Sequence, residues 1–248
     1  MPLLRRVSLT RKAEVGEPKE MLMKVTYYGH ACFSVQVANR TLLFDPFISG
    51  NERAKNIDPK TVPADYILIS HGHADHIGDA VDIAKRTGAL VISNFEVVNW
   101  FAKQGIARGH PLNHGGSHPF DFGRVKFVNA IHSSSLPDGA YGGNPGGFVV
   151  GSNEGNFYYS GDTALTLDLK IIGESTALKF AALCIGDNFT MGVDDALQAA
   201  TWINCNEILG VHYDTFPPIQ IDHQAALEKF KQAGKHLHLL KPGESHNF

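Results

Sequence analysis

Residues 70–79 read SHGHADHIGD and place three histidines and two aspartates close together, directly after an apolar run. His71 and His73 are two apart in an extended segment, so their side chains point to the same side and can bind one metal ion. Asp75 and His76 come where the loop turns into a helix, and their different direction suits a second ion near the first. Without a cation, imidazole and carboxylate groups at this density would compete for protons and hydration. The cluster therefore predicts a metal site.

The remaining ligands must come from other parts of the chain, because four ligands in one loop cannot complete two metal sites. Three candidates follow segments that read as strands: His132 comes after RVKFVNAI, Asp162 ends NFYYSGD, and His212 lies in NEILGVHYD. A carboxylate between two ions can bridge them, and Asp162 is the natural candidate. Ligation by histidine and aspartate suits zinc, manganese, iron or nickel and excludes only a site dominated by thiolates. We therefore expect two divalent metal ions as cofactors, with zinc as the first choice.

The segments that must position these ligands begin as short extended runs. Strands are predicted for KVTYYG, CFSVQVA and TLLFDPF, with Asn39-Arg40 as the tight turn between the last two. DYILIS is a nearly continuous apolar run that fits a strand buried on both faces, and GALVIS is the next strand. Helices are expected over residues 77–87, ending at Gly88, and over EVVNWFAKQG, which ends at Gly105.

The second half of the chain repeats this order. GGFVVG and NFYYSGD form a hairpin across SNEG, FAALCIGDN and NEILGVHYD each run from an apolar strand into a polar loop, and QAALEKFKQAG is a final amphipathic helix. Two similar halves favour an α/β fold in which two sheets pack face to face with helices outside. Asp45, Asp187 and the candidate ligands then follow the carboxyl ends of strands, where open α/β sheets build their sites.

The composition is that of an ordinary globular protein. The 248 residues are 43% hydrophobic and 19% charged, which is enough for a substantial core. The formal charge of −3 leaves no global basic field, and no run of lysine and arginine suggests a dedicated nucleic-acid groove. Nucleic acid is not excluded and stays open as a substrate. Three cysteines with apolar neighbours indicate buried thiols in a reducing compartment. No apolar stretch approaches the roughly 20 residues that span a bilayer. We predict a cytoplasmic protein without a membrane segment, and a homo-oligomer stays open.

The first twenty residues differ from the rest. Residues 1–20 are of mixed charge and lack an apolar core of signal-peptide length. We expect a flexible N-terminal extension there, followed by a single domain over residues 21–248.

The motif H-G-H-A-D-H over residues 71–76, with the later His132, Asp162 and His212, resembles the H-x-H-x-D-H motif of the metallo-β-lactamase superfamily. The phrases YYGHACF, DPFISGN, IHSSSLPDG, GNPGGFVV, GDNFTMG and HYDTFP resemble more narrowly the metal-dependent hydrolases related to ascorbate-6-phosphate lactonases. The resemblance covers residues 23–245. It implies a four-layer αββα sandwich of two mixed β-sheets and a dinuclear metal centre.

The resemblance also implies roles for individual residues. It implies two sets of ligands and one bridge: His71, His73 and His132 for one ion, Asp75, His76 and His212 for the other, and Asp162 between them. His30, in YYGHACF, is placed near the metals, and we expect it to act in catalysis by touching substrate or a ligand. Asp75 is expected to orient the hydroxide and to pass a proton to the leaving group. We expect Asp45 and Asp187 to support ligands through hydrogen bonds.

Two cations that share a hydroxide supply a nucleophile near neutral pH, because each positive charge lowers the pKa of the bound water. The expected function is hydrolysis of a small ester, lactone or phosphoester. A nuclease or phosphodiesterase acting on RNA or DNA fits the two-metal geometry equally well. A flavodiiron-type redox protein is a remote alternative, because that chemistry usually places a carboxylate where His73 stands and adds a flavin domain. A non-catalytic metal-binding protein is the other remote alternative, and only an assay separates it from an enzyme.

A histidine-containing segment, a glycine-rich loop and one cysteine also lead to predictions. His110, His114 and His118 lie in a segment rich in glycine and proline, which favours a loop at the surface or lining the site. Residues 132–147, HSSSLPDGAYGGNPGG, are expected to form a lid that selects the substrate. Cys184 is expected to be structural, because its run FAALCIG is apolar throughout.

Overall fold

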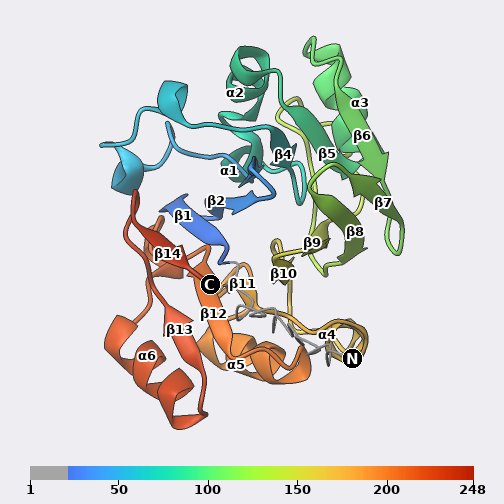
Figure 1. Cartoon of the computed structure of the whole chain (residues 1–248). Helices are drawn as coiled ribbons and strands as arrows, with labels where there is room; N and C mark the ends of the chain where they lie inside the picture. Colours follow the sequence, from blue (N-terminus) through green and yellow to red (C-terminus); the bar gives the residue numbers. More distant parts are fainter. Residues whose placement is uncertain (1–21) are drawn as a thin grey trace, which may run out of the picture.

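The computed structural model describes residues 22–248, which form two β-sheets packed face to face with helices outside (Figure 1). In the first sheet the strand order is β14 (Ser245–Asn247), β1 (Lys24–Gly29), β2 (Cys32–Val37), β3 (Arg40–Phe44), β4 (Tyr66–Leu68), β5 (Leu90–Asn94) and β6 (Gly109–Leu112). In the second sheet it is β13 (His236–His238), β12 (Glu207–Val211), β11 (Phe180–Cys184), β10 (Gly155–Tyr159), β9 (Gly146–Ser152), β8 (Gly123–Asn129) and β7 (Ser117–Phe120).

Helices flank both sheets, so the molecule has four layers (Figure 1). Those beside the first sheet are α1 (Ala74–Ile77), α2 (Ala80–Thr87) and α3 (Phe95–Lys103). Those beside the second sheet are α4 (Asp168–Ser175), α5 (Val193–Trp202) and α6 (His223–Gln232). Short 3₁₀ turns cover Glu52–Ala54, Pro59–Thr61 and Pro217–Ile219.

Both sheets are mixed. Strands β1 to β3 pair antiparallel and β3 to β6 pair parallel, while β7 to β10 pair antiparallel and β10 to β13 pair parallel. Each half of the chain therefore contributes an antiparallel group followed by parallel strands. This confirms the expected αββα sandwich of two mixed sheets.

Aromatic side chains hold the two sheets together. Phe44 of the first sheet stacks on Phe33 at 4.6 Å between ring centroids and meets Phe157 and Tyr159 of the second sheet at 5.8 and 5.5 Å. Phe157 also stacks on Phe180 at 4.9 Å. None of these five rings is exposed to solvent. Burial of several phenyl groups between the sheets is a dominant source of stability for such a sandwich.

The turn between β2 and β3 lies one residue earlier than predicted. Val37 pairs with Arg40, so the central residues of the turn are Ala38 and Asn39 rather than Asn39 and Arg40. Both have positive φ, at 48° and 59°, as a type I′ turn requires. Asparagine tolerates this conformation, and the alanine before it takes the other left-handed position.

The helix expected over residues 77–87 is two helices with a break at Gly78-Asp79. Asp79 explains the break, because its carboxylate accepts hydrogen bonds from the backbone of Ile48 and Ser49 at 2.6 and 2.9 Å. The side chain thus ties the loop after β3 to the start of α2. The end at Gly88 is as predicted, with φ at 70°.

The expectation of a loop at His110, His114 and His118 is wrong for two of them. His110 lies in β6 and His118 in β7, the facing edge strands of the two sheets, and their rings are 4.0 Å apart. Prolines at edge strands are tolerated because the missing N–H faces away from the sheet, which is why a Pro-rich segment can still pair. Strand β14 at the end of the chain was not expected either.

The extension expected over residues 1–20 lies outside the described residues. None of the helices in residues 22–248 combines the length and the apolar character needed to cross a membrane.

We predict that Phe157→Ala lowers the free energy of unfolding by about 3–5 kcal/mol, because it leaves a cavity between the sheets. Guanidinium unfolding followed by circular dichroism measures this. Phe95→Ala is the matched control: Phe95 is 57% exposed, so the expected change is within about 0.5 kcal/mol. Equal losses in the two variants would show that the rings between the sheets do not carry the core.

Candidate metal centre

The seven candidate ligands come together at one edge of the two sheets. Their places in the fold are these: His71 and His73 after β4, Asp75 and His76 in α1, His132 after β8, Asp162 after β10, and His212 directly after β12. The backbone N–H of His212 donates to the carbonyl of His30 at 2.8 Å, which links the ends of β12 and β1. The site thus forms where the strand ends of the two sheets meet.

Asp162 lies at the middle of the histidines. Its Oδ2 is 3.0 Å from Nε2 of His212, 3.2 Å from that of His76 and 3.6 Å from that of His132. Nε2 of His71 is 4.0 Å away. One carboxylate therefore faces histidines of both expected sets, as a bridging ligand must.

The donor atoms of the described residues form three groups: two parallel the two expected sets, and the third joins Asp45 to His71 and His76. The first set is matched by a group in which each residue has a donor atom within 4.8 Å of the others: His71, His73 and His132. Asp75, His76 and His212 form the second group under the same criterion, and His30 joins them. The structure thus brings together every residue of both sets.

Asp45 determines which ring nitrogens face the centre. The Ser70 hydroxyl donates to Asp45 at 2.5 Å and accepts from Nδ1–H of His71 at 2.9 Å. Nδ1–H of His76 donates to Asp45 at 2.7 Å, and Tyr159 donates to the same oxygen at 2.6 Å. Because Ser70 and Asp45 hold the Nδ1 protons of His71 and His76, Nε2 is the nitrogen of each ring that is left to bind a metal. The expected supporting role of Asp45 agrees with this geometry.

Three site residues have left-handed backbone conformations. The φ angles of His30, Asp45 and His212 are 55°, 39° and 55°, each at the first residue past a strand. Such conformations are uncommon for residues other than glycine and persist where the surroundings enforce them, often at functional sites. They turn each side chain from the strand direction toward the centre.

Gly161 allows the ligand-bearing segments of the two sheets to approach each other. A Cβ on Gly161, whose φ is 60°, would lie 2.6 Å from the carbonyl oxygen of Gly146 and 2.9 Å from Cβ of Ser70. Only glycine fits there. Asp162 can therefore reach the histidines that follow β4.

The electrostatics of the cluster favour a cation beside Asp162. Burial lowers the pKa of His76, but the carboxylates of Asp162 and Asp45 outweigh it and hold that pKa well above its ordinary value. Burial raises the pKa of Asp162, but His212 and His76 reverse this and hold it well below its usual range. Burial and then His76 lower the pKa of His71 well below normal, so its imidazole is a neutral ligand.

Three buried polar atoms of the cluster have no hydrogen-bond partner among the described residues: His76 Nε2, Asp162 Oδ1 and His212 Nδ1. Buried polar atoms are nearly always satisfied, so such a concentration calls for a group that binds there. Nε2 of His76 is 3.2 Å from Asp162 without the geometry of a hydrogen bond. Imidazole nitrogen and carboxylate oxygen are ligands of divalent transition metals. The residues present therefore fit metal ions.

His30 lies behind Asp75. Its Nε2 is 3.1 Å from Asp75 Oδ2 and its Nδ1 is 2.9 Å from the Thr215 hydroxyl. Burial and then His212 lower the pKa of His30 to about 4, so the neutral ring donates from Nε2 and accepts at Nδ1. The ring is buried and does not line the cavity beside the ligands. His30 therefore touches a ligand, as expected, and positions Asp75 rather than contacting substrate.

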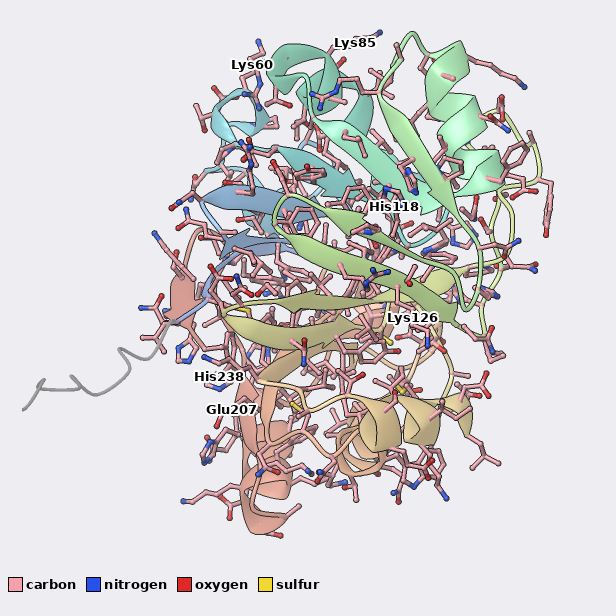
Figure 2. All side chains as sticks on the ribbon, turned by 45° about the vertical axis from the view of Figure 1, so that its right-hand side comes forward. Lys60, Lys85, His118, Lys126, Glu207 and His238 are labelled. Atoms are coloured by element: carbon pink, nitrogen blue, oxygen red, sulfur yellow. The ribbon has the colours of Figure 1, made fainter. Side chains whose placement is uncertain are left out.

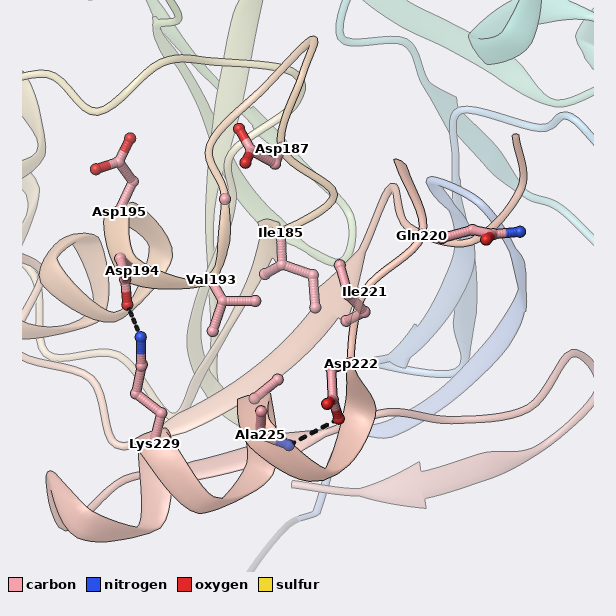
Figure 3. A pocket seen from close by; sticks show the side chains of 12 residues that line it. Ile185, Asp187, Val193, Asp194, Asp195, Gln220, Ile221, Asp222, Ala225 and Lys229 are labelled. Carbon is pink, nitrogen blue, oxygen red and sulfur yellow. Dashed lines mark hydrogen bonds and ion pairs between the residues drawn. The ribbon is translucent and has the colours of Figure 1, made fainter. Parts of the chain in front are cut away.

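The expectation that Asp187 supports a ligand is wrong. Asp187 is exposed, has φ at 61°, and accepts from its neighbour Asn188 at 2.8 Å. It lines a separate cavity of about 450 Å³ between α5 and α6 (Figure 3). Its place after β11 suggested the role, but among the described residues no hydrogen bond joins its carboxylate to a candidate ligand. Of the other acids in Figure 3, Asp194 forms an ion pair with Lys229, and Asp222 accepts from the backbone N–H of Ala225 at 3.0 Å.

The other histidines serve structural contacts. His114 Nε2 is 2.8 Å from the carbonyl of Pro145. His236 and His238 lie on β13, and both bond to Glu207 of β12, at 2.5 and 2.8 Å; Figure 2 labels Glu207 and His238. Neither place joins a group of potential metal ligands among the described residues.

Aromatic residues at the cavity were missed by the sequence reasoning. The cavity beside the ligands, about 250 Å³, is lined by Phe189 and Phe216. Of the expected lid, only His132 and Ser133 line it. The rest of that loop is held on two sides: the Asn94 side chain, before α3, donates to the carbonyls of Gly142 and Asn144, and Ser134 accepts from the backbone N–H of Gly72 at 3.1 Å. Phe189 lies in GDNFTMG and Phe216 in HYDTFP, two of the phrases that carried the resemblance, and this was the available signal.

Comparison with known proteins agrees with this geometry. Residues 24–212 match the model of the β-lactamase superfamily domain. A UPF0173 metal-dependent hydrolase of Flavobacterium johnsoniae is 53% identical over 223 residues, which are 90% of this chain and 99% of the relative. The chain belongs to the UPF0173 family of metal-dependent hydrolases. Another UPF0173 protein, from Christiangramia forsetii, is 53% identical over 224 residues, with the same shares of the two chains.

A solved structure supports the same placement. Igni18, a metallo hydrolase from the hyperthermophilic archaeon Ignicoccus hospitalis, superposes with a TM-score of 0.84 at 34% identity, over 92% of this chain and 98% of its own. As a UPF0173 member the chain is a metal-dependent hydrolase of the metallo-β-lactamase superfamily, and the cluster around Asp162 is where it could bind metal.

We predict that Asp45→Asn lowers metal affinity by about 10–100-fold, the usual cost of losing a partner that orients a ligand. The amide removes an acceptor from Ser70 or His76 and releases their ring orientation. Competition with a chelator measures the affinity. Asp187→Asn is the matched control and should bind metal as the wild type does; a loss of the same size there would contradict the assignment.

We also predict that the three thiols of the folded protein do not react with Ellman's reagent at about pH 8. Burial raises the pKa of Cys184 and of Cys205 to about 11 and that of Cys32 well above normal, so the reactive thiolate is scarce. Cys184 contacts Ser160 and Thr163 rather than a ligand, as a structural residue would. All three should react in guanidinium, and rapid reaction of Cys184 in the folded protein would show an accessible thiol.

Proposed function

We propose that this hydrolase acts on a small ester, lactone or phosphoester with two divalent metal ions, zinc first among them. The observation that carries the proposal is the place of Asp162, which faces histidines of two ligand sets. Seven donors are too many for one tetrahedral site, and a carboxylate between two groups is how two neighbouring ions share a ligand. The likeness to ascorbate-6-phosphate lactonases, noted from the sequence, supports a lactone among the candidates.

The ions would be held by His71, His73 and His132 on one side and by Asp75, His76 and His212 on the other, with Asp162 between them. When bound, they would supply an activated water near neutral pH and stabilise negative charge on the substrate oxygen.

Asp75 is the residue of this set best placed to handle protons. Its side chain is 29% exposed, unlike the fully buried His71 and His76, and it lines the cavity. Oδ2 accepts the hydrogen bond of His30 and is thereby fixed in place. The burial of Asp75 would raise its pKa, but His30 and then His76 hold it below its usual range, so it is a carboxylate at neutral pH. It can take a proton when water attacks and return it to the leaving oxygen.

The residues packed around His30 restrict the access of water to Asp75 and hold the His30 ring in place. His30 sits under Phe47 and Phe216, with ring centroids at 5.7 and 5.5 Å, and Thr215 bonds its far nitrogen. This packing leaves the cavity as the approach to Asp75. Rigid support of this kind is what an active site needs for reproducible geometry.

We predict two metal ions per chain and a loss of turnover when a ligand from either set is removed. His71→Ala and His212→Ala should each lower kcat by on the order of a hundred-fold or more, because even partners behind the ligands are worth 10–100-fold. Elemental analysis of the loaded protein gives the ion count, and a panel of aryl esters, lactones, bis(p-nitrophenyl) phosphate and single-stranded DNA gives the activity.

His110→Ala is the control, since His110 lies on β6 away from the cluster. It should keep two ions and full activity. A fully loaded wild type with at most one ion, or ligand variants that turn over at the wild-type rate, would contradict the proposal.

A further inference from the structure

The cavity beside the ligands contains two aromatic walls that the hydrolytic step does not use. Five of its eight lining residues are candidate ligands, and the other three are Ser133, Phe189 and Phe216. Its volume of about 250 Å³ is below the range of 300–1,000 Å³ typical of sites for drug-sized ligands. It is suited to one small group next to the reacting centre.

Phe189 is held at the mouth of this cavity by its backbone. It is 55% exposed, and the two residues before it, Asp187 and Asn188, have positive φ of 61° and 54°. The loop is closed by Asp187 N to Met191 O at 3.1 Å, and Met191 N bonds the carbonyl of Thr163 at 2.9 Å. Since Thr163 follows Asp162, the loop is fastened to the bridging ligand. Phe189 is thus exposed and lines the cavity, so its ring is available to a group bound beside the candidate ligands.

Phe216 forms the second wall. It is half-buried, packs edge-on against His30 at 5.5 Å, and lies 6.4 Å from Phe47. Two prolines follow it in the 3₁₀ turn Pro217–Ile219, and Ile219 N donates to its carbonyl at 3.1 Å. Proline fixes the backbone at this position, so the ring is pre-positioned and a ligand would lose little entropy in ordering it.

The same cavity has no lysine or arginine among the described residues that line it. Arg53 is in the neighbouring cavity of about 140 Å³ on the other side of His30, where it lies 3.4 Å from Asp214. Metal ions would neutralise charge at the reacting group, but not a second anionic group on the substrate. A phosphate handle or the adjacent phosphates of a nucleic acid would call for cationic side chains there.

We propose, on the basis of the hydrolase function above, that Phe189 and Phe216 bind an uncharged apolar group, and that the substrate is a neutral carboxylic ester or lactone carrying such a group. Water adds to the carbonyl carbon, the bond from that carbon to the ester oxygen breaks, and the proton given up by water passes to that oxygen. The products are a carboxylic acid and an alcohol, or a hydroxy acid from a lactone. Phosphorylated small molecules and nucleic acids are disfavoured.

Three esters that release the same chromophore test the class of substrate: p-nitrophenyl acetate, p-nitrophenyl butyrate and p-nitrophenyl hemisuccinate. The metal-loaded enzyme should prefer butyrate to acetate by about tenfold in kcat/KM, as two buried methylenes predict. The hemisuccinate has the same number of acyl carbons as the butyrate, with a carboxylate in place of the terminal methyl, and it should be at least about tenfold poorer than butyrate. A hemisuccinate rate equal to or above that of butyrate would overturn the inference.

Substitutions of Phe189 test whether this residue causes the preference for butyrate over acetate. Phe189→Ala should reduce the ratio of butyrate to acetate from about ten to about one, mainly through KM. Phe189→Lys should raise hemisuccinate relative to butyrate. Phe95→Ala is the matched control, because Phe95 is equally exposed, at 57%, and does not line the cavity. The same change of ratio in Phe95→Ala and Phe189→Ala would overturn the inference.

A binding measurement separates this inference from the hydrolytic function. Saturation-transfer NMR with N-phenylbutyramide, a neutral amide, should show contact with the wild type and with Phe95→Ala, and a clear loss with Phe189→Ala. If the enzyme cleaves bis(p-nitrophenyl) phosphate but neither binds this amide nor cleaves neutral esters, the hydrolase function stands and the substrate class is wrong. If it binds the amide but cleaves no compound of the full panel, the aromatic site stands and the proposed function is wrong.

Discussion

The buried carboxylate of Asp45 is the constraint on which the site depends. It accepts hydrogen bonds from the Ser70 backbone and hydroxyl, from Nδ1–H of His76 and from the Tyr159 hydroxyl, and it is fully buried. A buried charge is tolerated only when it is densely hydrogen-bonded, and these four bonds meet that need. Tyr159 lies in β10 of the second sheet, whereas Ser70 and His76 follow β4 of the first. The same carboxylate therefore joins the two halves and orients the candidate ligands His71 and His76.

The strand ends of the two sheets place the remaining candidate ligands. Strand ends bring His132, Asp162 and His212 to the edge where the loop after β4 already presents two histidines. Left-handed backbone at His30 and His212 then turns side chains inward, and the bond from His212 N to His30 O fixes one sheet against the other. The candidate metal centre and the packing of the sandwich are therefore parts of one structure, and a change that disrupts one should disrupt the other.

Much of this could be predicted from the sequence, because ligand chemistry and strand patterning are local signals. The H-x-H-x-D-H spacing and the polar residues after apolar runs predicted the seven residues that the structure brings together. Asp187 shows where this reasoning fails. It also follows a strand, but its backbone has a positive φ that the neighbouring residues do not predict, and its carboxylate does not support a candidate ligand. His30 was expected near the metals, yet its place behind Asp75 depends on Thr215, which is distant in sequence. The composition of the glycine-rich loop, residues 132–147, led to its prediction as a substrate-selecting lid. Phe189 and Phe216 are single phenylalanines in short turns, and only the structure shows that they line the cavity.

The central claim is that two metal ions share Asp162. Anomalous X-ray diffraction from crystals of the metal-loaded protein, collected on both sides of the metal absorption edge, tests it most directly. The expected map has two peaks, one among His71, His73 and His132 and one among Asp75, His76 and His212, with the Asp162 carboxylate between them. A single peak, or a second peak in the acidic cavity beside Asp187 instead of at Asp75, would contradict it.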